Sequence, residues 1–322
     1  MEIRIIRSQP PHLSNPLVHA KESVGMGGIP WLHYEAKTPE GFCIRGQRTL
    51  IHEGSSKPVL HFIHGNSYSG LTYLPLWQAL SPHADIILHD TQGHGDSDHG
   101  GSFVGWNRSA VIATDIGRQL QQHYADRPFI GVGHSFGGVL TSLMAASDPT
   151  LFKQLLLLDP IVFTPGMLRW MQPLQWIRLY SHNPIAKKAR KRRNEWVSIT
   201  DVMNSLRGRG MFRGWTEEAL RAYAEYATEP LAQGGRRLKC APEREAEIFS
   251  SYARGLWSTL PRIEVPTHAW IGERSYPFVH QSMARWQQQN PHFSYTPVPG
   301  GHCFMLEHPE ETAQRLFAAL KT

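Results

Sequence analysis

The sequence predicts an α/β protein, in which helices cover both faces of a mostly parallel sheet and a helical segment is inserted near the middle. Three observations predict this class. Short runs that are apolar on both faces, such as the four leucines at 155–158, alternate with helical patterns, as in a parallel sheet covered on both sides. The turn Gly-His-Ser-Phe-Gly at 133–137 joins one such run to a helix. The alternation stops after Val162 and resumes near residue 259.

Composition and length agree with a large globular core. The chain has 322 residues, of which 41% are hydrophobic and 19% charged, with a formal net charge of +6, so the composition is not that of a disordered chain. Cys43, Cys240 and Cys303 are scattered, which predicts no disulfide framework and fits a reducing compartment. The first residues do not resemble a signal peptide, and no run is long enough to span a bilayer. We therefore expect a soluble cytoplasmic protein.

The first half of the chain supplies most of the predicted sheet. Residues 1–30 are rich in proline and glycine and are expected to be a loosely structured lead-in. Alternating patterns at 31–35 and 49–53 predict two antiparallel strands. The parallel sheet is then expected from strands at 59–63, 86–90, 129–133 and 155–158, with helices at 72–80, 110–124 and 139–146.

Residues 163–258 lose the alternation and are rich in tryptophan, arginine and lysine. Helices are predicted at 216–228, where Thr216 is a suitable N-cap, and at 242–252. The tryptophans are expected to pack this stretch onto the core. A strand at 266–272, a helix at 280–289, a strand at 294–297 and a helix at 309–320 complete the pattern. We therefore predict a core of residues 1–162 and 259–322 and an inserted helical cap of residues 163–258.

The turn at 133–137 has the form of a nucleophile elbow, Gly-x-Ser-x-Gly between a strand and a helix. Gly133 and Gly137 have no Cβ, which allows the strand and the helix to approach each other at a strained turn. Ser135 would then project above the sheet at a helix N-terminus, which favours a developing negative charge. An idle serine in a glycine-rich turn is the alternative, and the strand and helix on either side favour the nucleophile.

Three further motifs accompany the elbow: His64-Gly65 after one strand, Gly-His-Gly-Asp-Ser-Asp at 93–98 after the next, and Gly300-Gly301-His302 near the end of the chain. With these motifs the sequence resembles the α/β-hydrolase superfamily over nearly its whole length. The resemblance implies the α/β-hydrolase fold with an inserted cap.

The resemblance also implies catalytic roles. Ser135 would be the nucleophile, and His302 would accept its proton as general base and return it later as general acid. The backbone N–H groups of Asn66 and Phe136 would form the oxyanion hole, in which losing one donor typically costs about 3–4 kcal/mol of transition-state stabilisation. The order serine, acid, histidine along the chain is also that of the family.

The identity of the acid needs a separate argument. Capped hydrolases commonly carry Gly-Glu-Xaa-Asp after the strand at 266–272, but this chain has Ser275 in place of the Asp, and serine cannot supply the negative charge. Asp159 follows the strand at 155–158, where some members of the superfamily, including certain haloalkane dehalogenases, carry their acid. Glu273 is the second candidate. We favour Asp159, because a carboxylate at a strand end can better reach the outer nitrogen of the histidine.

Other polar residues of these motifs are expected to be structural. His64 and His94 would support their turns, and Asp90 precedes the serine and would hold its own loop. Dehalogenases and epoxide hydrolases use an aspartate nucleophile, so Ser135 argues against both activities. The sequence contains no His-Glu-x-x-His pattern and no dinucleotide-binding glycine motif in a suitable context, so we expect no metal and no cofactor.

Six of the seven residues at 187–193 are basic. Such runs are usually solvent-facing, with long side chains packed over apolar neighbours, and we expect the same here. The alternatives are attraction of an anionic substrate or of a membrane surface that carries acidic lipids. We expect no nucleic-acid partner, because the run lies in a cap over a catalytic core and no binding motif accompanies it.

These observations predict a serine hydrolase that cleaves a carboxylic ester or a related acyl bond through an acyl-enzyme on Ser135. The expected partner is a small molecule whose apolar acyl part is enclosed between cap and core. A carbon–carbon bond hydrolase, a thioesterase and a lactonase stay open within the enzyme class. A ligand-binding or signalling protein with little turnover is the alternative from another class, because Ser275 replaces the usual acid.

Overall fold

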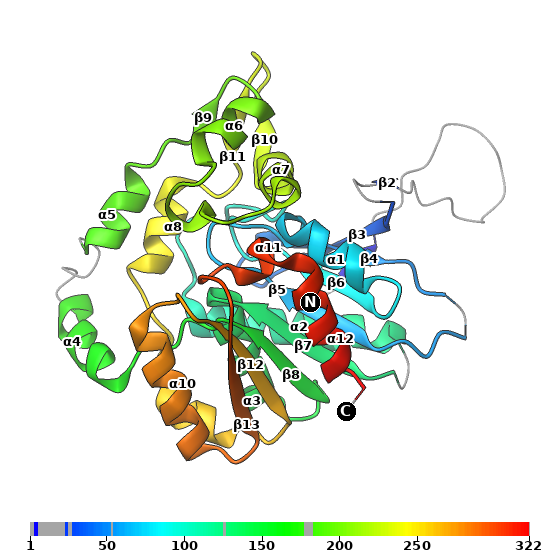
Figure 1. Ribbon diagram of the computed structural model, residues 1–322, viewed down its shortest axis with the longest axis vertical. Coiled ribbons are helices and arrows are strands. Elements are labelled where there is room, and N and C mark those ends of the chain that lie inside the picture. Colours follow the sequence, from blue (N-terminus) through cyan, green and yellow to red (C-terminus); the bar gives the residue numbers. More distant parts are fainter. Residues whose placement is uncertain are drawn as a thin grey trace.

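Ten strands form one sheet within the part of the chain that the structure describes, a computed structural model covering residues 3–5, 23–24, 28–52, 54–124, 127–176 and 183–321. The strand order is β1-β3-β4-β6-β5-β7-β8-β12-β13, with β2 paired to β3 (Figure 1). The parallel strands are β5 (Val59–Ile63), β6 (Asp85–His89), β7 (Phe129–His134), β8 (Gln154–Leu158), β12 (Thr267–Gly272) and β13 (Phe293–Val298). The mostly parallel sheet predicted from the apolar runs is therefore confirmed.

The register of the central strands brings the motif residues to one edge of the sheet. Ile63 at the end of β5 pairs with Gly133 near the end of β7, and His134 pairs with Leu158 at the end of β8. Because these strands are parallel, the segments that follow them all leave the sheet at the same edge. The residues after β5, β7 and β8 include Asn66, Ser135 and Asp159.

One expectation about the antiparallel strands of the sheet was wrong. The second early strand is β4 (Cys43–Thr49), which pairs with β3 (Pro30–Lys37) and β6, and residues 50–52 are not in a strand. The strand predicted at 49–53 was therefore misplaced, and Glu53 lies outside the described residues. The sequence of β4 is polar, yet Gln47 and Arg48 are buried. At Gly46 a Cβ would lie 2.0 Å from the carbonyl oxygen of Leu88, so close pairing requires glycine there.

The expected lead-in at residues 1–30 falls mostly on residues that the structure does not describe. Its described parts are partly ordered as strands: β1 (Ile3–Ile5) and β2 (Ser23–Val24) both pair antiparallel with β3. The expectation of a loose segment was wrong for these two short stretches, because backbone pairing with β3 holds them.

Helices cover both faces of the sheet, as expected. The side chains of β5 alternate between two hydrophobic cores. Phe62 packs in the core shared with Trp77, and Ile63 packs in the core shared with Trp286. The α-helices outside the inserted stretch 163–258 are α1 (Leu74–Leu80), α2 (Trp106–Gln121), α3 (Phe136–Ser147), α10 (Pro277–Gln289), α11 (Phe304–Glu307) and α12 (Pro309–Ala319). Within the described ranges, every helix is too short or too polar to cross a membrane.

Residues 163–258 add no strand to the main sheet in their described part. They are not wholly helical, because β9, β10 and β11 form a small antiparallel sheet of their own. These strands are only two or three residues long, too short to show an alternating pattern in the sequence. In Figure 1 this sheet lies with α6 and α7 at the top of the molecule, beyond the main sheet. The elements are α4 (Pro165–Trp176), α5 (Pro184–Arg190), β9 (Glu195–Trp196), α6 (Ile199–Leu206), α7 (Glu217–Tyr226), β10 (Thr228–Pro230), β11 (Arg236–Leu238), α8 (Pro242–Phe249) and α9 (Leu256–Thr259).

Local predictions within this inserted segment (residues 163–258) are partly confirmed. The Oγ1 of Thr216 accepts a hydrogen bond from the backbone N–H of Ala219 and caps α7. Trp215 packs against Tyr68, which lies outside the inserted segment, with ring centroids 5.7 Å apart. Five of the six basic residues at 187–193 are exposed, but Arg192 is partly buried and pairs with Glu245 at 2.6 Å. The expectation of a solvated basic face was therefore wrong for Arg192.

Candidate active site

Ser135 lies in a sharp turn between β7 and α3. Its backbone has φ 54° and ψ −115°, a left-handed conformation that a non-glycine residue adopts only when its surroundings impose it. The surroundings are tight: a Cβ at Gly133 would lie 2.5 Å from the carbonyl oxygen of Gly137. At Gly137, a Cβ would lie 2.1 Å from the carbonyl oxygen of Ile63. Both glycines are therefore required for strand, turn and helix to meet.

His302 bridges Ser135 and Asp159. Its Nε2 lies 2.9 Å from Oγ of Ser135, and its Nδ1 lies 2.9 Å from Oδ1 of Asp159. A carboxylate only accepts hydrogen bonds, so Nδ1 carries the proton and Nε2 is free to accept the proton of the serine hydroxyl. Asp159 is fully buried, while 15% of the His302 side chain and 8% of Ser135 are exposed. This arrangement can activate a serine and leaves it reachable from outside.

Two donors besides His302 hold the Asp159 carboxylate. The backbone N–H of Gly272 donates to Oδ2 at 2.7 Å, and the hydroxyl of Ser275 donates to Oδ1 at 2.6 Å. Asp159 itself has φ 46°, so its backbone is strained like that of Ser135. Glu273, the second candidate acid, is exposed and forms no ion pair within the described ranges. Of the two predicted carboxylates, the structure brings Asp159 to the histidine.

The loop after β5 lies against the start of α3. The backbone N–H groups of Asn66 and Phe136 have no hydrogen-bond acceptor in the part of the chain described here. Asn66 and Phe136 both lie in segments that leave the sheet at the same end as Ser135. Close by, the carbonyl oxygen of Ile63 packs against Gly137, where a Cβ would not fit. Two free N–H groups near a serine can stabilise an oxyanion.

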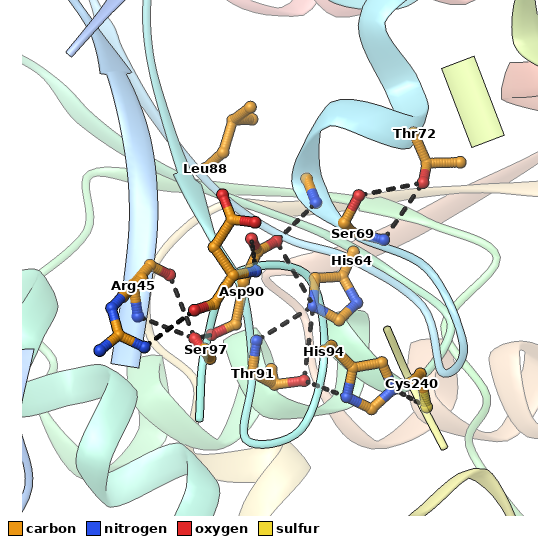
Figure 2. Close-up of polar contacts among 12 residues, drawn as sticks. Arg45, His64, Ser69, Thr72, Leu88, Asp90, Thr91, His94, Ser97 and Cys240 are labelled. Atoms are coloured by element: carbon orange, nitrogen blue, oxygen red, sulfur yellow. Dashed lines mark hydrogen bonds and ion pairs between the residues drawn. The ribbon is translucent and has the colours of Figure 1, made fainter. Parts of the chain in front are cut away.

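His64 and His94 each accept a hydrogen bond from a backbone N–H group, and Figure 2 shows the contact between His64 and Thr91. The Nε2 of His64 accepts from the N–H of Thr91, and the Nε2 of His94 accepts from the N–H of Ser67, each at 3.0 Å. Burial lowers the pKa of His64 to about 4, which keeps it neutral and able to accept. Asp90 likewise accepts from the N–H of Gly70 at 2.8 Å and ties its loop to the segment that follows β5.

A chain of hydrogen bonds behind the site was not predicted from the sequence. The N–H of Gly65 donates to the hydroxyl of Tyr73 at 3.1 Å, and that hydroxyl donates to Nδ1 of His134 at 2.6 Å. The Nε2–H of His134 then donates to the carbonyl oxygen of His302 at 3.0 Å. Burial, with the neighbouring His302, lowers the pKa of His134 well below its ordinary value. This chain links the loop of Asn66 to the loop of His302, and nothing in the sequence around Tyr73 indicates it.

Metal binding has no obvious site here, since the described residues include no group of three or more His, Cys, Asp and Glu side chains that could hold an ion.

A serine held at such a turn, on a mostly parallel sheet of this order, is the architecture of the α/β hydrolases. The chain belongs to the alpha/beta hydrolase family, whose family model matches residues 62–315. Its curated relatives include esterases and lipases.

Individual relatives differ in how much of the chain they match. A pimeloyl-[acyl-carrier protein] methyl ester esterase of Xanthomonas oryzae pv. oryzae is 26% identical over 80% of this chain and 93% of its own length. A mouse monoglyceride lipase is 34% identical, but over 24% of this chain and 26% of the lipase, so that match spans about a quarter of either protein. The solved structure of E-2-(acetamidomethylene)succinate hydrolase is 23% identical, with a TM-score of 0.68 over 91% of this chain and all of that one. This last likeness shows the fold alone.

Proposed function

We propose that the protein is a serine hydrolase that cleaves a carboxylic ester or a related acyl bond through an acyl-enzyme on Ser135. The observation that carries the proposal is His302 within 2.9 Å of both Ser135 Oγ and Asp159 Oδ1. A nucleophile, a base and an orienting carboxylate in this geometry are what acyl transfer requires.

The reaction would proceed in two steps. His302 takes the proton of Ser135 as the serine oxygen attacks the acyl carbon, and Asp159 stabilises the imidazolium that forms. The oxyanion is held by the N–H groups of Asn66 and Phe136, which have no other acceptor within the described residues. His302 then protonates the leaving group. In the second step it activates a water molecule that hydrolyses the acyl-enzyme and frees Ser135.

The substrate we propose is a small molecule with an apolar acyl part of small to medium size. We place that part beneath the inserted segment, which we interpret as a cap over the site, and contacts such as Trp215 on Tyr68 support this. We propose an ester first, because the relatives named above include a methyl ester esterase and a lipase. A thioester, a lactone and a carbon–carbon bond remain alternative substrates. A cytoplasmic location is part of the proposal and is supported by the free thiols of Cys43, Cys240 and Cys303.

Labelling with a fluorophosphonate probe tests the proposal. We expect the wild type to be labelled and Ser135→Ala to remain unlabelled. We also expect the wild type to hydrolyse p-nitrophenyl esters, with kcat/KM varying along a series of graded acyl lengths. An inert Ser135 in a folded protein with His302 intact would contradict the proposal and favour a ligand-binding protein with little turnover.

A further inference from the structure

The inserted segment contacts the rest of the fold at the turn Asn66-Ser67, which lies in the loop after β5. Ser67 has φ 75°, so the turn contains a non-glycine residue in the left-handed region, and only 2% of Ser67 is exposed. Such a conformation persists only where neighbouring groups impose it. The neighbours that impose it here come largely from the inserted segment.

Glu245 of α8 accepts hydrogen bonds from both residues of the turn. Its backbone carbonyl accepts a hydrogen bond from the side-chain amide of Asn66 at 3.1 Å. Its carboxylate oxygen Oε2 accepts from the hydroxyl of Ser67 at 3.2 Å. One residue of the inserted segment therefore holds the side chains on either side of the Asn66–Ser67 peptide bond.

Arg192, from the basic run at 187–193, binds both Ser67 and Glu245. Its Nη1 donates to Oγ of Ser67 and to Oε2 of Glu245, both at 2.6 Å, and its Nη2 donates to the hydroxyl of Tyr223 at 3.0 Å. The Glu245 side chain is 6% exposed and that of Arg192 17% exposed, so the pair is largely shielded from water and from salt. The fork of a guanidinium with three partners fixes direction as well as distance.

The turn is also held by a backbone hydrogen bond to His94. The backbone N–H of Ser67 donates to Nε2 of His94. The Sγ of Cys240, another residue of the inserted segment, lies 3.2 Å from the same nitrogen, and Figure 2 shows this contact. With the Ser67 N–H and both side chains of the turn engaged, the N–H of Asn66 is left without an acceptor among the described residues. That N–H is the one the proposed function assigns to the oxyanion hole.

We propose that Arg192 and Glu245 are positioning residues, which aim the Asn66 N–H at the oxyanion by clamping Ser67 from the inserted segment. The inference rests on the proposed function and deepens it, because it makes the inserted segment a part of the transition-state site as well as a cover. An oxyanion forms only after attack, so this clamp stabilises the transition state more than the bound substrate. Loosening it lowers kcat and leaves KM nearly unchanged.

Three variants test the clamp. Ser67→Ala removes the hydroxyl that both residues hold and leaves the Arg192–Glu245 ion pair intact, so no buried charge loses its partner. Arg192→Gln removes the guanidinium. Arg193→Gln is the matched control, because it removes the neighbouring charge of the same run, where Arg193 pairs with Asp201 at the surface.

The assays are hydrolysis of p-nitrophenyl butyrate and inhibition by phenylboronic acid, whose adduct with a serine mimics the tetrahedral intermediate. For Ser67→Ala and Arg192→Gln we expect kcat to fall about tenfold to a hundredfold, less than the loss of a whole donor, because the N–H is misaligned and not removed. We expect KM to change less than threefold and the boronic acid to bind more weakly by a factor similar to that in kcat. Arg193→Gln should match the wild type in all three quantities.

The outcomes separate the inference from the function on which it rests. Unchanged kcat and boronic-acid affinity in folded Ser67→Ala, checked by thermal unfolding, would overturn the clamp alone. A rise in KM at constant kcat would also overturn it, since the residues would then bind substrate. A wild type that is neither active nor labelled at Ser135 would overturn the proposed function and the clamp together.

Discussion

The hydroxyl of Ser275 donates a hydrogen bond to Oδ1 of Asp159, the same oxygen that accepts from Nδ1 of His302. Position 275 is where many capped hydrolases resembling this chain carry their acid. In this protein the carboxylate that contacts His302 stands directly after β8, and position 275 supplies a neutral donor to it. Ser275 therefore helps to hold the Asp159 carboxylate in place beside the histidine.

The variant Asp159→Asn should lose most of its activity and keep its fold. Asparagine tolerates the left-handed backbone of residue 159, but it has no charge to stabilise the imidazolium and can favour the wrong tautomer of His302. We expect kcat to fall by about 10³–10⁴, measured on a p-nitrophenyl ester. Glu273→Gln is the control, because Glu273 is exposed, and it should retain near-normal activity. Near-normal turnover in Asp159→Asn with an inactive Glu273→Gln would reverse the assignment.

A double variant tests whether a carboxylate at position 275 can replace that of Asp159 beside His302. Ser275 Oγ lies 2.6 Å from the oxygen that holds His302, so a carboxylate at 275 should come within reach of the same ring nitrogen. We expect Asp159→Asn/Ser275→Asp to recover kcat by about tenfold or more over Asp159→Asn, a part of the stabilisation that the charge supplies. Ser275→Asp alone should be impaired, because two carboxylates would then compete for one site. A double variant no faster than Asp159→Asn would show that position 275 cannot reach the histidine productively.

The sequence was most informative where the features are local. The elbow around Ser135 follows from two glycines that flank a serine between a strand and a helix, and the structure shows why neither glycine can carry a Cβ. The strands of the parallel sheet follow from apolar runs buried on both faces. Strand β4 does not follow from such a run, because its Gln47 and Arg48 are polar and nevertheless buried.

Long-range contacts lay beyond sequence reasoning for the same physical reason. Tyr73 meets His134 across 61 positions of the chain, and Arg192 meets Ser67 across 125. Each pairing exists only once the sheet has been assembled and the inserted segment has packed on it. The basic run around Arg192 is typical of a solvated surface, and one guanidinium leaves that surface because Glu245 offers it a buried partner.

Tyr73→Phe should destabilise the protein and slow it. The hydroxyl of Tyr73 accepts from the buried N–H of Gly65 and donates to His134, so its loss leaves two buried polar groups without a partner. We expect the free energy of unfolding to fall by about 1–3 kcal/mol, measured by urea denaturation at pH 7.5, together with a lower kcat. Tyr295→Phe is the control, since the Tyr295 hydroxyl has no hydrogen-bond partner in the described ranges, and its stability should stay close to that of the wild type.

His61 makes the stability of the fold depend on pH. The residue is fully buried on β5, both ring nitrogens lack a hydrogen-bond partner within the described residues, and the rings of Phe129 and Phe152 lie about it at centroid distances of 5.9 and 6.1 Å. Burial lowers the pKa of His61 to about 4. The unfolded chain, with an ordinary pKa near 6.5, binds the proton more readily, so stability is lost as pH falls from about 6.5 to about 4.

His61→Phe removes the titrating group and the two unpartnered nitrogens while it keeps a flat ring against its aromatic neighbours. Between pH 7.5 and pH 5 the wild type should lose about 2 kcal/mol of unfolding free energy through this residue, and the variant should lose less by that amount. Urea denaturation at the two pH values measures the difference. His292→Asn, at an exposed position, controls for the loss of one histidine and should keep the slope of the wild type. An equal loss of stability in the wild type and in His61→Phe would show that other groups cause the acid sensitivity.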